Sequence, residues 1–349
     1  MTTLRWLFAT TALFLGLADV FAVEKAAPQA YLGAIVTDAE SGRILFEDNA
    51  DVSNPPASMT KLMTFAVLHD KLVSGTLTLE TPVIVTAADS RMGGTQVWLK
   101  EKETFPVEEL IYAMMIQSAN DAAYALARVA AGSPEAFVEL MNAKAHALGM
   151  TQTAFRTPHG LPPSNRRIAE GDLTTPRDFA QLCRYLLIET DITKYSSVRS
   201  RPFGASRPAG AVVMNNHNHL LGKIPGLNGL KTGFTNGAGF CLSATAERNG
   251  RRIIAVVMGG SDSKSRDLKV AELIERGFAA LPAALPTVKT GAPAARATTP
   301  AGPAGIPTVK TDKTSPAARP EPVERAPEQS STSKDPGLTF RVVAPQKKP

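Results

Sequence analysis

Cysteine is scarce in this sequence: only Cys183 and Cys241 occur among 349 residues. A single pair could form a disulfide in an exported protein, but a domain of this size does not need one. Both cysteines lie in apolar segments, 179–187 and 239–245, which have the patterns of a helix and a strand. Neither has a nearby histidine that would indicate a thiol nucleophile. We therefore expect two buried free thiols.

Long apolar runs are missing after the first 22 residues. At the N-terminus, Arg5 supplies a positive charge, residues 6–17 are almost wholly apolar, and residues 20–22 form a small-residue cleavage pattern. This run is shorter than the ~20 residues that span a bilayer. Residues 1–22 are therefore predicted to be a cleaved secretory signal rather than a membrane anchor. The mature chain is expected to work outside the cytoplasm, in a bacterial periplasm or at the cell wall.

A strong charge of one sign is also missing from most of the chain. The net charge is +6, but residues 281–349 hold ten basic and five acidic residues and so account for five of those charges. Because the remainder is close to neutral, no nucleic-acid partner is expected.

The same C-terminal segment differs from the rest in composition. It contains 13 of the 26 prolines, and it cannot bury enough apolar surface to offset the entropy of ordering it. Residues 283–349 are predicted to be a disordered tail rich in proline, alanine and lysine. The tail is either a solvated linker or a segment weakly attracted to anionic wall polymer or lipid. Residues 23–282 are expected to form one catalytic domain.

Three short motifs occur in a fixed order: Ser58-Met59-Thr60-Lys61, Ser118-Ala119-Asn120 and Lys231-Thr232-Gly233. A serine one helical turn before a lysine places a hydroxyl and an amine on the same helix face, which pairs a nucleophile with a possible base. The second motif adds a hydroxyl and an amide. The third adds a cation followed by a glycine, where a strand can admit a substrate backbone. Each motif is weak alone, but together, behind an export signal, they indicate an acyl-transfer site.

The order of the expected elements indicates an α+β fold, in which an antiparallel sheet packs against helices and contains an inserted helical region. Helices are expected at 58–74, 107–131, 134–148, 176–190 and 266–280, the last packing through Leu268, Leu273, Ile274 and Phe278. Strands are expected at 31–37, 43–46, 230–235, 239–245 and 252–258. The dipeptide Asn249-Gly250 favours a tight primed turn between the last two strands.

These motifs resemble those of low-molecular-mass penicillin-binding proteins of the serine D-Ala-D-Ala carboxypeptidase family. The likeness extends to segments 55–64, 118–122, 157–161 and 230–235, and it covers roughly residues 28–282. It implies the penicillin-binding-protein/β-lactamase-like fold and removal of the terminal D-alanine from peptidoglycan stem peptides ending in D-Ala-D-Ala. It also implies that no metal or organic cofactor is needed and that β-lactam antibiotics are covalent inhibitors.

The resemblance assigns roles to the first two motifs. Ser58 would be the nucleophile, with Lys61 as its base, since burial and the nearby Lys231 cation would lower the pKa of Lys61. Ser118 would relay a proton towards the leaving amine. Asn120 would hydrogen-bond the substrate amide and orient Lys61.

The resemblance also assigns substrate-binding roles near the third motif. Lys231 and Thr232, beside Gly233, would position the terminal carboxylate. The backbone N–H groups of Ser58 and Phe234 would form an oxyanion hole. Arg266 is expected to bind the same carboxylate, with a solvated helix-start residue as the alternative.

Other functions stay open. A D,D-endopeptidase acting on crosslinked peptidoglycan would use the same machinery. Residues 170–174 resemble a water-positioning segment of serine β-lactamases, but Thr174 replaces its asparagine, so a helix-entry loop is the preferred interpretation. A catalytically inactive wall-binding protein is the third alternative. His159 is interpreted as a structural turn residue, and His217 and His219 have no acidic neighbour that would indicate a metal site.

The tail departs from the pattern of the family. Many relatives continue into a small β-sandwich and a C-terminal amphipathic helix that holds them to the membrane. Residues 283–349 show no strand alternation, and 337–343 are too short and too closely bounded by proline for an anchor helix. We expect no firm membrane anchor and an exported periplasmic enzyme that is soluble or loosely associated with the wall or membrane.

Overall fold

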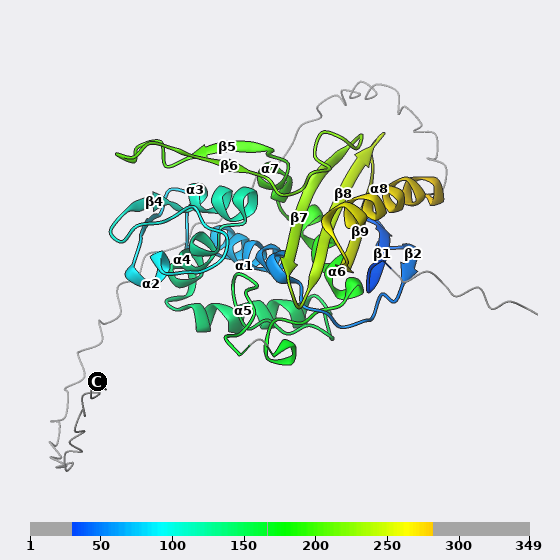
Figure 1. The fold of residues 1–349 in the computed structure, drawn as a ribbon, viewed down its shortest axis with the longest axis horizontal. Coiled ribbons are helices and arrows are strands. Elements are labelled where there is room, and N and C mark those ends of the chain that lie inside the picture. The colour runs from blue at the N-terminus through cyan, green and yellow to red at the C-terminus, as the bar shows by residue number, and fades with distance from the viewer. Residues whose placement is uncertain (1–29, 166, 282–349) are drawn as a thin grey trace, which may run out of the picture. The chain divides into compact units, whose positions relative to one another are not determined.

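Five antiparallel strands form the main sheet, in the order β2-β1-β9-β8-β7 (Figure 1). They are β1 (Gly33–Asp38), β2 (Ile44–Asp48), β7 (Leu227–Thr235), β8 (Gly239–Arg248) and β9 (Arg251–Gly260). The first of the described strands, β1, therefore pairs with the last, β9, as the sequence predicts. The computed structural model describes residues 30–165 and 167–281, so the expected signal (1–22) and tail (283–349) lie outside the described residues.

Alternating side chains of the sheet enter two separate cores. In β9, Ile253 packs with α8 (Ser263–Ala280) on one face, while Ile254 packs with the helical region on the other. This period of two is expected for a strand that is buried on both sides. Helix α8 begins three residues earlier than predicted, because Asp262 caps it by accepting a hydrogen bond from the Ser265 N–H at 2.8 Å.

Helices from the middle of the chain form the inserted region that the sequence predicts. They are α1 (Lys61–Val73), α2 (Ala87–Ser90), α3 (Val107–Tyr112), α4 (Asn120–Ala131), α5 (Pro134–Ala147), α6 (Pro176–Glu189) and α7 (Ile192–Ser196). Three shorter helical segments are η1 (Ala57–Thr60), η2 (Ala113–Gln117) and η3 (Ile168–Glu170). Among the described residues, none of these helices is long and apolar enough to cross a membrane.

Two details of the predicted helices are wrong. The continuous helix expected at 107–131 is interrupted at Ser118, whose φ of 62° is left-handed and ends the π-helical segment η2. Leu268 was expected to pack in the last helix, but its side chain is 63% exposed. Two small sheets were not predicted: β3 (Pro82–Ile84) with β4 (Thr104–Pro106), and β5 (Ser200–Phe203) with β6 (Val212–Asn215).

Other local predictions are confirmed. Asn249 and Gly250 both have positive φ, 52° and 71°, as a primed turn between β8 and β9 requires. Cys183 and Cys241 are free and buried.

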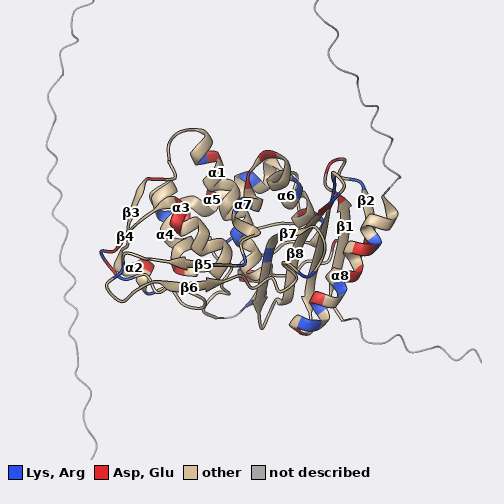
Figure 2. Cartoon of the chain, turned by 90° about the horizontal axis from the view of Figure 1, so that it is seen from above, with Lys and Arg blue, Asp and Glu red and all other residues tan. Residues whose placement is uncertain are grey.

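Acidic and basic residues are interspersed along the outer side of α8 (Figure 2).

Candidate active site

Ser58 lies in the single 3₁₀ turn η1 that leads directly into α1, so the α-helix itself begins at Lys61 rather than at Ser58. The residue before it, Ala57, has a left-handed φ of 48°, which a non-glycine residue adopts at some energetic cost. Ser58 is partly exposed, whereas Lys61 is completely buried. The turn therefore presents the hydroxyl to solvent and holds the amine beneath it.

The Lys61 amine is held by three oxygen atoms. Its Nζ lies 2.7 Å from Asn120 Oδ1, 2.8 Å from the His159 carbonyl oxygen and 3.0 Å from Ser58 Oγ. The first two oxygens can only accept, so they take the two N–H groups of a neutral amine. Its lone pair is then left to accept the Ser58 hydroxyl proton.

The surroundings of Lys61 favour this neutral form. Burial, and secondly the positive charge of Lys231, hold the pKa of Lys61 well below its ordinary value of 10.5. The carboxylate of Asp172 acts in the opposite direction. Both causes named in the sequence analysis therefore operate on this amine.

The second motif lies at the break between η2 and α4. Ser118 is almost fully buried, and its left-handed backbone turns the chain so that Asn120 begins the next helix. The Asn120 backbone N–H donates to Thr95 O at 2.8 Å, and its Nδ2 donates to Gly93 O at 2.8 Å. The side-chain amide of Asn120 is thus held between Gly93 O, which accepts from its nitrogen, and Lys61 Nζ, which its oxygen faces.

The third motif lies in β7, against the turn that carries Ser58. A Cβ added to Gly233 would lie 2.4 Å from Pro56 O, so only glycine allows the strand this close. Lys231 is buried, and its Nζ donates to Thr232 O at 3.2 Å. Burial, followed by the charge of Arg266, lowers the pKa of Lys231 to about 7.

A cavity of about 360 Å³ joins the three motifs. It is lined by Ser58, Thr95, Ser118, His217, His219, Thr232, Gly233, Phe234, Phe240, Ser263 and Arg266. Six of the predicted site residues line this cavity: Ser58, Ser118, Thr232, Gly233, Phe234 and Arg266. The other three each form a hydrogen bond with a lining residue: Lys61 with Ser58, Asn120 with Thr95 and Lys231 with Thr232.

Arg266 is only 4% exposed, so the alternative of a solvated helix-start residue is wrong. Its Nε and Nη2 donate to Asp267 Oδ1 at 2.9 and 2.7 Å, and its Nη1 donates to Cys241 O at 3.4 Å. These bonds fix a guanidinium at the wall of the cavity. A buried cation in a cavity suits an anionic ligand such as a carboxylate.

Two residues beside the site were missed in the sequence. His217, considered only as a metal ligand, lines the cavity, and burial followed by Lys231 lowers its pKa to about 4. Asp172 accepts from the N–H groups of Arg156 and Thr157 at 2.7 and 3.0 Å, and from the hydroxyls of Thr60 and Thr157 at 2.8 and 3.1 Å. It therefore ties the 154–172 segment to the turn that holds Ser58.

The remaining candidates have structural contacts. His159 is buried, its Nδ1 accepts from the Leu161 N–H at 3.1 Å, and burial lowers its pKa to about 3. Glu170 is exposed, pairs with Arg167 at 3.1 Å and does not line the cavity that contains Ser58, as a water-positioning carboxylate would. Residues 170–174 instead lead into the cap of α6, where Thr175 Oγ1 accepts from the Asp178 N–H at 3.1 Å.

Comparison with known proteins identifies the family of this chain. The family model for D-alanyl-D-alanine carboxypeptidase, peptidase S11, matches residues 21–262. The D-alanyl-D-alanine carboxypeptidase DacA of Escherichia coli is 36% identical over 251 residues, which cover 70% of this chain and 60% of that protein. DacF of Bacillus subtilis is 33% identical over 245 residues, which cover 70% and 61%. The chain thus spans about 60% of the length of these two relatives.

Solved structures give the same result. DacD of Francisella tularensis superimposes with a TM-score of 0.66 at 27% identity, covering 77% of this chain and 73% of that one. Penicillin-binding protein D2 of Listeria monocytogenes, in its ampicillin-bound form, gives a TM-score of 0.63 at 31% identity, with coverage of 71% and 97%. The fold is therefore that of the penicillin-binding proteins, as the sequence predicts.

Proposed function

The chain belongs to the peptidase S11 family of D-alanyl-D-alanine carboxypeptidases, and from this premise we propose that it removes the terminal D-alanine from peptidoglycan stem peptides. The observation that carries the proposal is the Lys61 amine. It lies 3.0 Å from Ser58 Oγ, with both of its N–H groups engaged by other oxygens. This is the geometry of a serine nucleophile with an adjacent base.

Acylation begins when the neutral Lys61 amine takes the Ser58 hydroxyl proton. Ser58 Oγ then attacks the carbonyl carbon of the penultimate D-alanine, and the backbone N–H groups of Ser58 and Phe234 donate to the resulting oxyanion. As the C–N bond breaks, Ser118 gives its hydroxyl proton to the amine of the terminal D-alanine and receives the proton that Lys61 took from Ser58, so that both residues return to their starting state. Water then hydrolyses the ester at Ser58, which releases the shortened peptide and restores the hydroxyl.

The leaving D-alanine carries the charge that orients the substrate. Its carboxylate fits the 360 Å³ cavity, where Arg266 and Thr232 lie at the wall and the buried Lys231 donates to Thr232 O. An anion in this cavity favours the protonated form of Lys231 and so strengthens its own binding. Asn120 keeps one amide N–H beyond its bond to Gly93 O, and this N–H donates to the substrate amide.

The same site would react with β-lactam antibiotics. Their strained amide carbonyl corresponds to the reacting carbonyl of the peptide, and the carboxylate on the neighbouring ring corresponds to the terminal carboxylate. Penicillin-binding protein D2 of L. monocytogenes, a related protein, has crystal structures with ampicillin bound and with cefotaxime bound. We further propose export to the periplasm, supported by the signal pattern in residues 1–22. The mechanism uses side chains and water throughout.

D-Alanine release from a pentapeptide ending in D-Ala-D-Ala tests this function. The parent protein is expected to release D-alanine, and both Ser58→Ala and penicillin treatment are expected to abolish it. Release at the parental rate by Ser58→Ala would contradict the proposal. The endopeptidase alternative is favoured if a crosslinked dimer is cut while the free pentapeptide is not.

A further inference from the structure

Trp98 is displayed to solvent from a strained backbone position. It is 63% exposed, and its φ of 58° lies in the left-handed region, which bulky residues rarely adopt. Burial does not explain this conformation, because most of the residue remains in water. Backbone strain of this kind persists only where the surroundings impose it, and it is concentrated at functional positions.

Four hydrogen bonds hold the backbone on either side of Trp98. The buried Asp121 carboxylate accepts from the N–H groups of Val97 and Leu99 at 3.3 and 3.0 Å. The Arg207 guanidinium donates to the carbonyl oxygens of Val97 and Trp98 at 2.9 and 3.3 Å. Since Val97 and Leu99 are both buried, the indole ring is the part of this segment that projects outwards.

Arg207 is itself held firmly. It comes from the turn between β5 and β6, its side chain is 8% exposed, and it pairs with Glu103 at 2.7 Å. Its guanidinium also lies 4.8 Å from the ring centre of Phe203 and 5.1 Å from that of Phe105. Contacts from two distant parts of the sequence, at Asp121 and at Arg207, therefore fix the backbone of Trp98.

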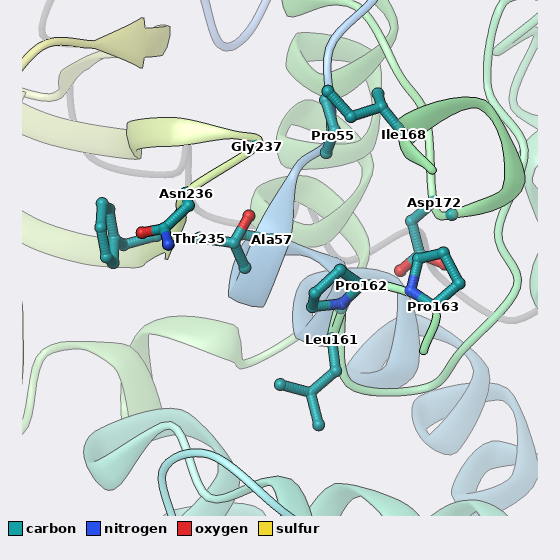
Figure 3. A pocket seen from close by; sticks show the side chains of 13 residues that line it. Pro55, Ala57, Leu161, Pro162, Pro163, Ile168, Asp172, Thr235, Asn236 and Gly237 are labelled. Carbon is teal, nitrogen blue, oxygen red and sulfur yellow. The ribbon is translucent and has the colours of Figure 1, made fainter. Parts of the chain in front are cut away.

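The segment that carries Trp98 also borders the candidate active site. Thr95 lines the 360 Å³ cavity, and the chain from Thr95 to Trp98 spans at most about 11 Å. The same segment touches Leu161, because a Cβ added to Gly94 would lie 3.1 Å from Leu161 Cδ2. Leu161 in turn lines the neighbouring cavity of about 460 Å³ (Figure 3). Trp98 therefore lies within reach of a group attached to a substrate in the site.

The surroundings of Trp98 decide which ligand suits its ring. The exposed residues that follow, Lys100, Glu101 and Lys102, are charged, so the ring does not belong to an apolar patch that would dock a protein or a lipid surface. An isolated aromatic face suits a pyranose ring, whose C–H groups meet the electron-rich face while its hydroxyls remain in water. The stem peptides of the proposed function are attached to a polymer of such sugars.

We propose that Trp98 is a stacking site for the glycan strand of peptidoglycan, beside the site that cuts the stem peptide. The four stem residues before the terminal D-alanine span at most about 14 Å, so one substrate molecule is long enough to reach both Ser58 and Trp98. Because the second contact is then intramolecular, it raises the affinity for glycan-linked substrates over free peptides. The identity of the polymer rests on the proposed function, but binding of the sugar is measured without catalysis.

Indole fluorescence reports this contact directly, because Trp6 and Trp98 are the two tryptophans of the chain. All proteins carry Trp6→Phe, which leaves Trp98 as the single source of the signal. The probe is a peptide-free tetrasaccharide of N-acetylglucosamine and N-acetylmuramic acid. In parallel, kcat/KM for D-alanine release is measured with a disaccharide-linked pentapeptide and with the free pentapeptide.

Three variants are compared with the parent. Trp98→Asn removes the ring and tolerates the left-handed backbone, so the fold is retained. Trp98→Phe keeps an aromatic ring. Leu268→Ala is the matched control, because Leu268 is also 63% exposed but lies on α8.

The tetrasaccharide is expected to change the fluorescence saturably in the parent and in Leu268→Ala. The ratio of kcat/KM for the glycan-linked over the free pentapeptide should fall by roughly five- to tenfold in Trp98→Asn, as loss of one aromatic contact does, and by less in Trp98→Phe. Leu268→Ala should keep the parental ratio. If the fluorescence does not respond, or if Trp98→Asn keeps the parental ratio, the inference is wrong, while D-alanine release by the parent still supports the proposed function. If the parent releases no D-alanine from either substrate but its fluorescence responds, the proposed function is wrong and the sugar site stands.

Discussion

Replacing Lys231 by methionine should make the protein more stable and inactive. Lys231 is 3% exposed, donates to Thr232 O at 3.2 Å, and has its pKa lowered from 10.5 to about 7 by burial and by Arg266. A folded-state pKa below the unfolded value means that the unfolded chain binds the proton more tightly. Each pH unit of that difference corresponds to about 1.4 kcal/mol, so the protonated Lys231 lowers the free energy of unfolding by at most about 5 kcal/mol.

The destabilisation caused by burying the Lys231 charge depends on pH. It is fully present below about pH 7 and disappears as the pH rises towards 10.5, where the lysine of the unfolded chain also loses its proton. Methionine has a similar length and no charge, so it can fill the same space. After allowance for imperfect packing, we expect Lys231→Met to raise the free energy of unfolding by about 2–4 kcal/mol at pH 6.5 and by much less at pH 9.5.

Urea unfolding followed by circular dichroism measures this difference, with Lys223→Met as the control at an exposed lysine. The control should leave the stability of the parent nearly unchanged at both pH values. D-Alanine release should be lost in Lys231→Met only. If the free energy of unfolding of Lys231→Met does not exceed that of the parent at pH 6.5, or if the difference is the same at pH 9.5, burial of the Lys231 charge does not destabilise the fold as we expect.

Two further substitutions test the geometry around Ser58. Arg266→Gln should raise KM for a D-Ala-D-Ala peptide by roughly tenfold or more with a smaller change in kcat, since it removes a charged partner of the carboxylate; a loss confined to kcat would exclude that role. Gly160→Ala places a Cβ 2.0 Å from Ala57 O at a φ of 84° and should lower kcat/KM by roughly a hundredfold. Gly132→Ala, at a φ of 83° with open space around it, is the control and should retain activity; equal losses in both variants would indicate backbone strain alone.

Local patterns in the sequence predicted those parts of the fold that local chemistry determines. The spacing of Ser58 and Lys61 placed both side chains on one turn, and Asn249-Gly250 specified its hairpin through positive φ values. The pairing of β1 with β9 also followed from the order of the elements. For the Ser58 turn and the hairpin a short segment contains the whole cause, whereas the pairing of β1 with β9 joins distant segments and followed only from the order of the elements.

The buried stripe of α8 shows a pattern that was present in the sequence and was not used. Its buried residues are Arg266, Val270, Leu273, Ile274 and Gly277, which recur at helical spacing. Arg266 falls on this stripe and Leu268 does not. The stripe alone therefore predicts a buried arginine and an exposed leucine.

Other features depend on contacts between distant segments. The apolar run 107–117 favours a continuous helix, and only the partners of the next residues, such as the Asn120 N–H to Thr95 O bond, reveal the break at Ser118. The role of Asp172 follows from four hydrogen bonds with Thr60, Arg156 and Thr157, which no spacing in the sequence indicates. Such residues are found only when the folded neighbours are known.

The central claim is that Ser58 forms a covalent acyl-enzyme with a D-Ala-D-Ala peptide. Rapid quenching of the reaction, followed by intact-mass measurement and peptide mapping, tests it most directly. The account predicts an adduct on Ser58 with the mass of the acylating peptide minus one D-alanine, formed by the parent and not by Ser58→Ala. Rapid D-alanine release that is still catalysed by Ser58→Ala, or an adduct mapped to another residue, would contradict it.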